Sequence, residues 1–314
     1  FKRTDEKYEH LHFALNGLGF AYMGLAQHGF SKGLFAKVAM EKAIKFSKLS
    51  LVENRRFPLP YDVMGRLYLI KARSLDAHGQ DPIPALKLAE RASLTGLALK
   101  KDFVNLYLNA AHSWLLQVKH TSQFKKRSNL IIQAQKALKK ALQIRPLLGK
   151  ALRLQSIVHL ELARQAITGK KDPSRHFNNA QTKISLALKQ SPGLTRVHLT
   201  HTHLQHQRAI WSAMTQSRAV MQRVLHQWDK AIKALVQRRP KLPEARAQRA
   251  LFHLYRAKVL SAKLQPKEKA FAQKTARELL KGAFLENKNL KRAYIGYVKA
   301  IASFRLQNPQ KKDK

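Results

Sequence analysis

The stretch AQKALKKALQIRP at 134–146 recurs three more times, without gaps, in this chain of 314 residues. The matching stretches are AQTKISLALKQSP at 180–192, WDKAIKALVQRRP at 228–240 and ARELLKGAFLENK at 276–288. Their starts are 46, 48 and 48 residues apart, and RASLTGLALKKDF at 91–103 fits the same frame 43 residues before the first. Five positions before the end of each stretch stands a small or apolar residue, at Ala98, Ala141, Ala187, Leu235 and Ala283. Self-similarity at such a period indicates stacked repeats of about 46 residues.

Each repeat is predicted to be a pair of antiparallel helices. Apolar residues recur at three- and four-residue spacings in nearly every segment, and convincing alternating strand patterns are lacking. Pro146, Pro192 and Pro240 end helices, because proline has no amide donor and clashes with the preceding turn. We expect helices at 8–28, 34–50, 61–78, 82–100, 104–120, 127–144, 147–168, 173–190, 194–214, 218–238, 243–263, 267–286 and 289–306.

Helix pairs of this kind cannot bury their apolar faces singly, so they stack on one another. The predicted fold class is therefore all-α, a right-handed α-solenoid of about six antiparallel helix pairs plus a terminal helix, with a concave face. We expect three parts: an N-terminal helix pair and linker at 1–60, the repeat array at 61–306 and a disordered basic tail at 307–314. The likeliest irregular segment is 51–60, which contains RRFPLP.

Two corners between helices look alike. GQDPIPAL at 79–86 and GKKDPSRHF at 169–177 place their Asp-Pro pairs 91 residues apart. Asp81 and Asp172 suit the N-cap position, where a carboxylate accepts the first free amides, and the prolines that follow suit the first helical position. Gly79 and Gly169 suit the end of the preceding helix, where a left-handed residue is needed. The two corners should mark equivalent turns with one repeat between them.

The composition is very basic. Sixty Lys and Arg residues against 18 Asp and Glu give a formal net charge of +42, and acids are missing from 103–160 and from 173–228. Such a field favours an anionic partner, although solvated helix faces in a basic protein would have the same composition. With 45% hydrophobic residues the chain can bury a core. The absence of cysteine excludes disulfides, thiolate metal sites and thiol nucleophiles.

The sequence has no pattern typical of an enzyme. Gly17-Leu18-Gly19 lies in an apolar helical run and indicates a close packing point rather than a phosphate loop. No kinase catalytic loop is present, and no two acids are spaced for acid–base work. The run VHLTHTHLQH at 197–206 lacks the HExxH spacing or a nearby carboxylate that a zinc site would want. We therefore expect a non-enzymatic protein without cofactor or metal.

The repeats resemble those of the tetratricopeptide-type family. Its second-helix and exit pattern is matched by Ala134, Leu138, Ala141 and Pro146, and again by Ala180, Ile184, Ala187 and Pro192. Its first helix is matched more weakly, by Ala151 with Ser156 and Ala245 with Ala250, because the usual Trp and Gly are mostly missing.

The repeat is also longer than that family's 34 residues. Its length and the Asp-Pro corner are similar to the arrays that follow the catalytic domain in many bacterial serine/threonine protein kinases. This resemblance implies a cytoplasmic docking or regulatory module of a larger signalling protein, which would itself have no catalytic role.

The family's geometry also implies a ligand surface. In that family the first helix of each repeat lines the concave wall. The lining positions are the second, fifth, ninth and twelfth, where the third residue after the exit proline counts as the first. Carried onto this sequence, these positions nominate Tyr107, Trp114, Lys150, Arg153, Arg196, His203, His206, Arg292 and Lys299.

Such a wall suits a protein or peptide partner with an acidic segment. It also suits a nucleic-acid backbone, with Trp114 and Tyr107 as stacking platforms. Both aromatics are more typical of an inter-helix core than of a ligand surface. A second basic cluster is formed by Lys125, Lys126, Arg127, Lys136, Lys139 and Lys140. Association with anionic membrane surfaces is a third hypothesis, and no transmembrane segment is expected.

Overall fold

The protein is all-α over the residues described in a computed structural model, which are 10–32, 36–215, 218–259, 266–288, 290–291, 294–295 and 298. Its helices are α2 (Leu11–Ser31), α3 (Lys37–Glu53), α4 (Leu59–Ala77), α5 (Ile83–Leu99), α6 (Val104–Lys119), α7 (Phe124–Ile144), α8 (Gly149–Thr168), α9 (Ser174–Gln190), α10 (Thr195–Thr215), α11 (Arg218–Arg238), α12 (Pro243–Val259) and α13 (Pro266–Glu286). None of them is long and apolar enough to cross a membrane.

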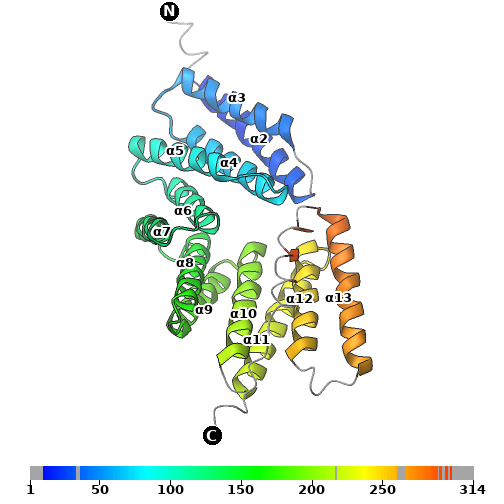
Figure 1. Ribbon diagram of the computed structural model, residues 1–314. Coiled ribbons are helices and arrows are strands. Elements are labelled where there is room, and N and C mark those ends of the chain that lie inside the picture. The colour runs from blue at the N-terminus through cyan, green and yellow to red at the C-terminus, as the bar shows by residue number, and fades with distance from the viewer. Residues whose placement is uncertain are drawn as a thin grey trace, which may run out of the picture. The chain divides into compact units, whose positions relative to one another are not determined.

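The helices form two compact units, 1–158 and 159–314, whose boundary falls inside α8. Consecutive helices pair along the chain, as Figure 1 shows. In the first unit α2 packs on α3, α4 on α5 and α6 on α7, while the first helices of these pairs also pack on one another, α2 on α4 and α4 on α6. In the second unit α10 pairs with α11 and α12 with α13, and α10 packs on α12. This is the stacking of helix pairs that the repeats predict.

Most predicted helices agree with the structure to within two or three residues at each end. Helix α3 continues to Glu53, so the irregular segment begins at Asn54 rather than at 51. The prediction for 243–263 runs past the described end of α12 at Val259, and most of 289–306 lies outside the described residues. The division into 1–60, 61–306 and 307–314 stays a prediction.

A buried residue, small in every case except Leu235, marks the exit of every second helix. The amide that closes each helix donates to the carbonyl of Ser50, Gly96, Ala141, Ala187, Leu235 or Ala283. These residues lie 46, 45, 46, 48 and 48 positions apart, and all are buried. The predicted frame is therefore wrong by two residues at 91–103, where Ala98 is exposed and Gly96 holds the equivalent place. A β-carbon at Gly96 would lie 2.6 Å from Leu106 Cδ1, which explains why glycine is needed there.

The Asp-Pro corners are N-terminal helix caps, as predicted. Asp81 Oδ1 accepts the Ile83 amide at 2.9 Å, and Asp172 Oδ1 accepts the Ser174 amide at 3.0 Å and the Ser174 hydroxyl at 2.6 Å. The two hydrogen bonds from Ser174 also hold the pKa of the Asp172 carboxyl below its usual value. Pro82 already has helical dihedrals, with φ −83° and ψ −12°, so it occupies the first helical position.

The left-handed residue of these corners is Gly79 in one and Lys170 in the other, with φ of 82° and 56°. The prediction for Gly79 is confirmed and the prediction for Gly169 is wrong by one residue. The two corners make the same closing bonds, Gln80 amide to Leu75 carbonyl and Lys171 amide to Ala166 carbonyl. Because these bonds fix the register, the left-handed conformation falls on Lys170, and lysine bears the steric cost that glycine avoids.

Candidate functional site

The residues nominated from the sequence divide between the two units. Tyr107, Trp114, Lys150 and Arg153 belong to the first unit, and Arg196, His203 and His206 belong to the second. Lys150 and Arg196 are exposed, while Tyr107, Arg153 and His203 are half-buried. The Tyr107 hydroxyl donates to the Lys101 carbonyl at 2.9 Å. Arg292 and Lys299 lie outside the described residues.

Two of the nominated side chains are core residues rather than surface residues. Trp114 is 7% exposed and packs in α6 among buried residues. His206 is 0% exposed, and its ring stacks on Trp228 with centroids 4.8 Å apart. Burial lowers the pKa of His206 to about 3, with a smaller contribution from the positive charge of Arg164. Neither side chain presents a surface to a ligand.

An arginine–histidine pair links first helices in each unit, and of these four residues the sequence frame nominated only His203. Arg73 Nη2 lies 3.0 Å from His112 Nε2 between α4 and α6, and Arg164 Nη2 lies 3.0 Å from His203 Nε2 between α8 and α10. Arg164 also forms an ion pair at 2.6 Å with Glu161, which is 2% exposed. The two arginines are 91 residues apart, as are the two histidines and the two Asp-Pro corners.

The corrected frame explains why His112 was overlooked. With Gly96 as the exit residue, the ninth position of the next first helix is His112, equivalent to His203 in the second unit. The uncorrected frame chose Trp114, two residues later, which faces the core instead. The 91-residue spacing already visible at the corners was the signal that could have found this residue.

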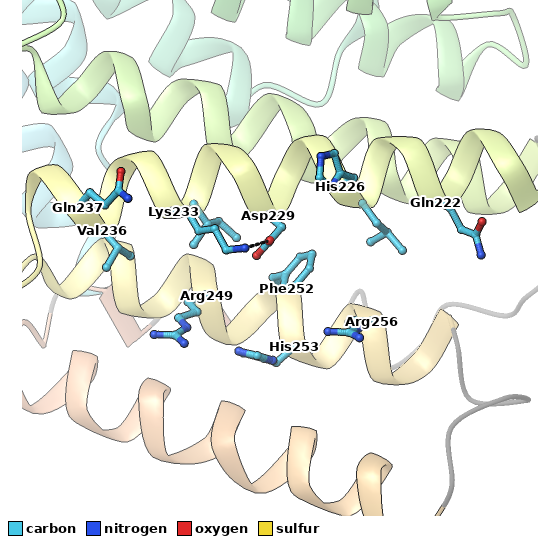
Figure 2. A pocket seen from close by; sticks show the side chains of 12 residues that line it. Gln222, His226, Asp229, Lys233, Val236, Gln237, Arg249, Phe252, His253 and Arg256 are labelled. Atoms are coloured by element: carbon cyan, nitrogen blue, oxygen red, sulfur yellow. Dashed lines mark ion pairs between the residues drawn. The ribbon is translucent and has the colours of Figure 1, made fainter.

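The second unit contains a pocket of about 530 Å³ between α11 and α12. We call it the α11–α12 pocket, and Figure 2 shows the side chains that line it. Its floor is apolar, since Leu225, Ile232 and Phe252 are buried, with Val236 beside them half-buried. The lining residues are Gln222, Leu225, His226, Asp229, Ile232, Lys233, Val236, Gln237, Arg249, Phe252, His253 and Arg256.

The rim of the pocket is predominantly cationic. Lys233, Arg249 and Arg256 line the pocket together with one acid, Asp229. Lys233 Nζ lies 2.7 Å from Asp229 Oδ2, the ion pair drawn in Figure 2. Among the residues that the structure describes, neither arginine has a carboxylate within ion-pair distance. The two arginines therefore leave donors available to an anion from outside.

His253 lies in the same lining and is half-buried. Its pKa is lowered, first by burial and then by the charges of Arg249 and Arg256, while Asp229 acts in the opposite direction. The ring is therefore neutral near neutral pH, and an anion bound beside it would favour its protonated form. No cluster of three metal-binding side chains occurs within the described ranges.

An apolar floor beneath unpaired guanidinium groups can hold a segment that carries both a carboxylate and an apolar side chain. The pocket has no nucleophile paired with a base. The sequence did not predict it, because its walls come from two helices of different repeats. The only sequence signal was the concentration of cations on α11 and α12.

Comparisons with known proteins establish the fold. Neither models of known protein families nor curated protein sequences give a significant match. Among solved structures, a thermophilic TPR protein of Thermus thermophilus superposes with a TM-score of 0.54 at 13% identity, over 76% of this chain and 96% of that one. Pseudomonas aeruginosa pilF gives 0.48 at 13% identity over 92% and 99% of the two chains. YrrB, a TPR protein with an unusual peptide-binding site, gives 0.36 at 13% identity over 81% and 97%.

The chain thus has the fold of a tetratricopeptide-repeat protein, built here from longer repeats than that family's 34 residues.

Proposed function

We propose that this protein is a non-catalytic helical-repeat scaffold that binds a protein partner through an acidic segment. The observation that carries the proposal is the α11–α12 pocket, where Arg249 and Arg256 flank a buried apolar floor. An acidic segment with interspersed apolar residues supplies carboxylates for the guanidinium groups and a side chain for the floor. The fold supports this function because stacked helix pairs present extended surfaces to partners.

Charge reversal at the rim tests the proposal. The probe is a short labelled peptide of alternating glutamate and leucine, compared with a peptide in which glutamine replaces glutamate. Arg249→Glu combined with Arg256→Glu should weaken binding of the acidic peptide at least tenfold. The matched control is Lys274→Glu with Lys281→Glu on α13, which makes the same change in net charge at exposed positions of the same unit.

If both double variants bind equally well, attraction by the overall charge is sufficient and the pocket is not the site. A second change addresses the floor, since Val236→Asp puts a like charge against the incoming carboxylates while Val236 is only half-buried. Binding that survives both Val236→Asp and the arginine variant would also contradict the proposal. Circular dichroism of each variant verifies that α11 and α12 still fold.

Basic side chains of the first helices are proposed as a further contact region for the same partner. Lys150 in the first unit and Arg196 in the second are exposed, while Arg153 and His203 are half-buried. Their support is the positive charge along segments without acids, 103–160 and 173–228. Lys150→Glu with Arg153→Glu should weaken binding less than the pocket variant does, because single exposed charges contribute little.

A nucleic-acid scaffold is the second candidate, and the exposed face of α7 favours it. Lys125, Lys126, Lys136, Lys139 and Lys140 are all exposed on this helix, and α7 contains no acid. A row of lysines suits a phosphate backbone. Mixed-sequence RNA or DNA bound at micromolar affinity near physiological salt, and released by Lys136→Glu with Lys140→Glu, would support it. No detectable binding would remove it.

We also propose that the chain works as a docking module of a larger bacterial signalling protein. Its support is the resemblance of the long repeat and the Asp-Pro corner to arrays beside bacterial kinase domains. A kinase domain in the same open reading frame would support this context, and an open reading frame without one would remove it. Neither result changes the expected peptide binding.

A further inference from the structure

Helix α2 differs from the other described helices in having no acidic, lysine or arginine side chain among its 21 residues, although a quarter of the chain is charged. One side packs into the first unit, where Met23 and Ala26 share a core with Met40 and Ala43 of α3. The opposite side carries four large apolar side chains that remain exposed: Phe13 at 51%, Leu18 at 45%, Phe20 at 50% and Leu25 at 59%. An exposed patch of this kind marks an interaction surface.

The exposed side carries two rows of large residues with small residues between them. At about 100° per residue, Phe13 and Phe20 lie along one edge of this side and Leu18 and Leu25 along the other. The strip between the edges holds the exposed small residues Ala14, Gly17, Ala21 and Gly24. A β-carbon added at Gly17 or Gly24 would meet nothing within 4 Å, so the strip is open above them. We call these eight residues the α2 groove.

The α2 groove reads the same in both chain directions. From Gly19 toward the N-terminus, a large residue, Leu18, is followed by a small one, Gly17. After two intervening residues comes a small residue, Ala14, and then a large one, Phe13. The same order runs toward the C-terminus through Phe20, Ala21 and then Gly24, Leu25. A two-fold symmetric interface must be complementary to itself: where residue i of one copy contacts residue j of the other, residue j also contacts residue i. The pattern of large and small residues about Gly19 meets this condition for an antiparallel helix pair.

We propose that the α2 groove binds the α2 groove of a second copy of this chain, antiparallel, with the two Gly19 residues level. In that register each large side chain lies over a small residue of the other copy on the same edge. Phe13 meets Gly24, and Phe20 meets Gly17. On the other edge, Leu25 meets Ala14 and Leu18 meets Ala21. Such alternation of large and small residues lets two helices pack closely.

The lack of charge in the α2 groove permits a second copy as the occupant. Two chains of +42 repel each other, so a symmetric contact requires a surface where like charges do not meet. The α2 groove has no ionised side chain of its own. Arg66 lies beside one edge of the groove, with its guanidinium 5.3 Å from the Phe20 ring and 3.7 Å from Asp62, which offsets its charge. Phe13 is held by a T-shaped contact with Phe57 at 4.9 Å, which presets one edge of the groove.

The area suits a weak but specific dimer. Phe13 and Phe20, each about half exposed, leave roughly 100 Å² apiece to cover, and the two leucines leave somewhat less. With the small residues and backbone between them, two copies bury on the order of 1,000 Å², which is near the lower limit for a specific interface. Dimerisation in the micromolar range follows, and it should persist or strengthen with salt because screening reduces repulsion.

Sedimentation equilibrium of the full chain tests the dimer, with Gly17→Leu and Gly24→Leu as the decisive variants. Both add apolar surface at positions with free space, so they leave the monomer intact while filling the places where Phe20 and Phe13 of the second copy would lie. We expect each variant to raise the dimer dissociation constant at least tenfold. The control is Leu94→Ala on α5, 45% exposed outside the groove, which should have no effect.

A wild-type chain that stays monomeric throughout the micromolar range would overturn the proposal. Stronger association of the leucine variants would do the same, because it would indicate non-specific adhesion. If all variants stay monomeric while binding anionic phospholipid vesicles in proportion to their apolar surface, the face is a membrane contact instead.

Cross-linking tests the orientation, since the chain has no cysteine of its own. In the proposed register two Leu18 residues lie about 3 Å apart along the helix axes and two Ala14 residues about 15 Å apart, at a rise of about 1.5 Å per residue. Leu18→Cys should therefore form a disulfide dimer under mild oxidation, and Ala14→Cys should not. The opposite result would indicate a parallel pair and contradict the antiparallel register.

Discussion

Replacement of His206 by phenylalanine should make the second unit less sensitive to acid. The His206 ring is fully buried against Trp228, and burial lowers its pKa to about 3. The unfolded chain binds a proton near the ordinary value of about 6.5, so between these two values the unfolded state holds more protons than the folded state. The stability that depends on a neutral His206 is therefore complete above about pH 6.5 and is lost as the pH falls.

The magnitude follows from the size of the shift. Each pH unit below the unfolded pKa costs about 1.4 kcal/mol for a histidine that stays neutral in the fold, so lowering the pH to about 5 costs about 2 kcal/mol at His206. His201, whose pKa burial lowers to about 4, adds a similar loss. Burial raises the pKa of Glu244, which acts in the opposite direction. His201 and Glu244 are present in both proteins, so their effects cancel when His206→Phe is compared with the wild type.

Urea unfolding near pH 7.5 and near pH 5 measures this difference. In a Trp114→Phe background the remaining tryptophans, Trp211 and Trp228, both report on the second unit. We expect His206→Phe, which keeps an aromatic ring against Trp228, to lose about 2 kcal/mol less than the wild type over this pH interval. His226→Phe, at an exposed position of α11, serves as the control. An equal loss in the wild type and His206→Phe would refute the assignment of a buried, neutral His206.

Gly96→Ala should lower the thermal midpoint, because its β-carbon would lie 2.6 Å from Leu106 Cδ1; overpacking of this kind costs about 1–3 kcal/mol. Lys170→Gly should raise the free energy of unfolding by up to about 1 kcal/mol, since φ of 56° strains lysine but not glycine. Asp81→Ala should cost about 1 kcal/mol in a denaturant titration and leave peptide binding unchanged, because Asp81 caps α5 in the first unit and does not line the α11–α12 pocket. Acidic-peptide binding should strengthen as the pH falls from neutral toward about 5, because a bound carboxylate raises the lowered pKa of His253; titration calorimetry should show proton uptake that His253→Gln abolishes.

The corners show how far local chemistry could be predicted. An aspartate followed by proline after a helix has few alternatives to an N-terminal cap, so both carboxylates lie where expected. The position of the left-handed residue was harder to predict, because it depends on which closing hydrogen bonds form rather than on where glycine occurs in the sequence. Those bonds place Lys170, not Gly169, in the left-handed region.

The candidate site shows where prediction from sequence ends. Trp114 and His206 matched ligand positions by counting, yet both are core residues. A shift of two residues along a helix turns a side chain by about 200°, slightly more than a half-turn, and a longer helix also changes the register. The α11–α12 pocket could not be predicted, since its walls come from Phe252 and the arginines of one repeat and Asp229 of the repeat before it.

The sequence by itself determined the helical period, the repeat of about 46 residues and the capped corners, since these depend on residues close together in the chain. It also contains the palindromic pattern of α2. Only the tertiary structure decided which faces are covered, because burial depends on neighbouring helices that are distant in sequence. That is why the stretch ending at Pro146 was recognisable at once, whereas the exposed α2 groove and the paired Arg164 and His203 required the packed helices.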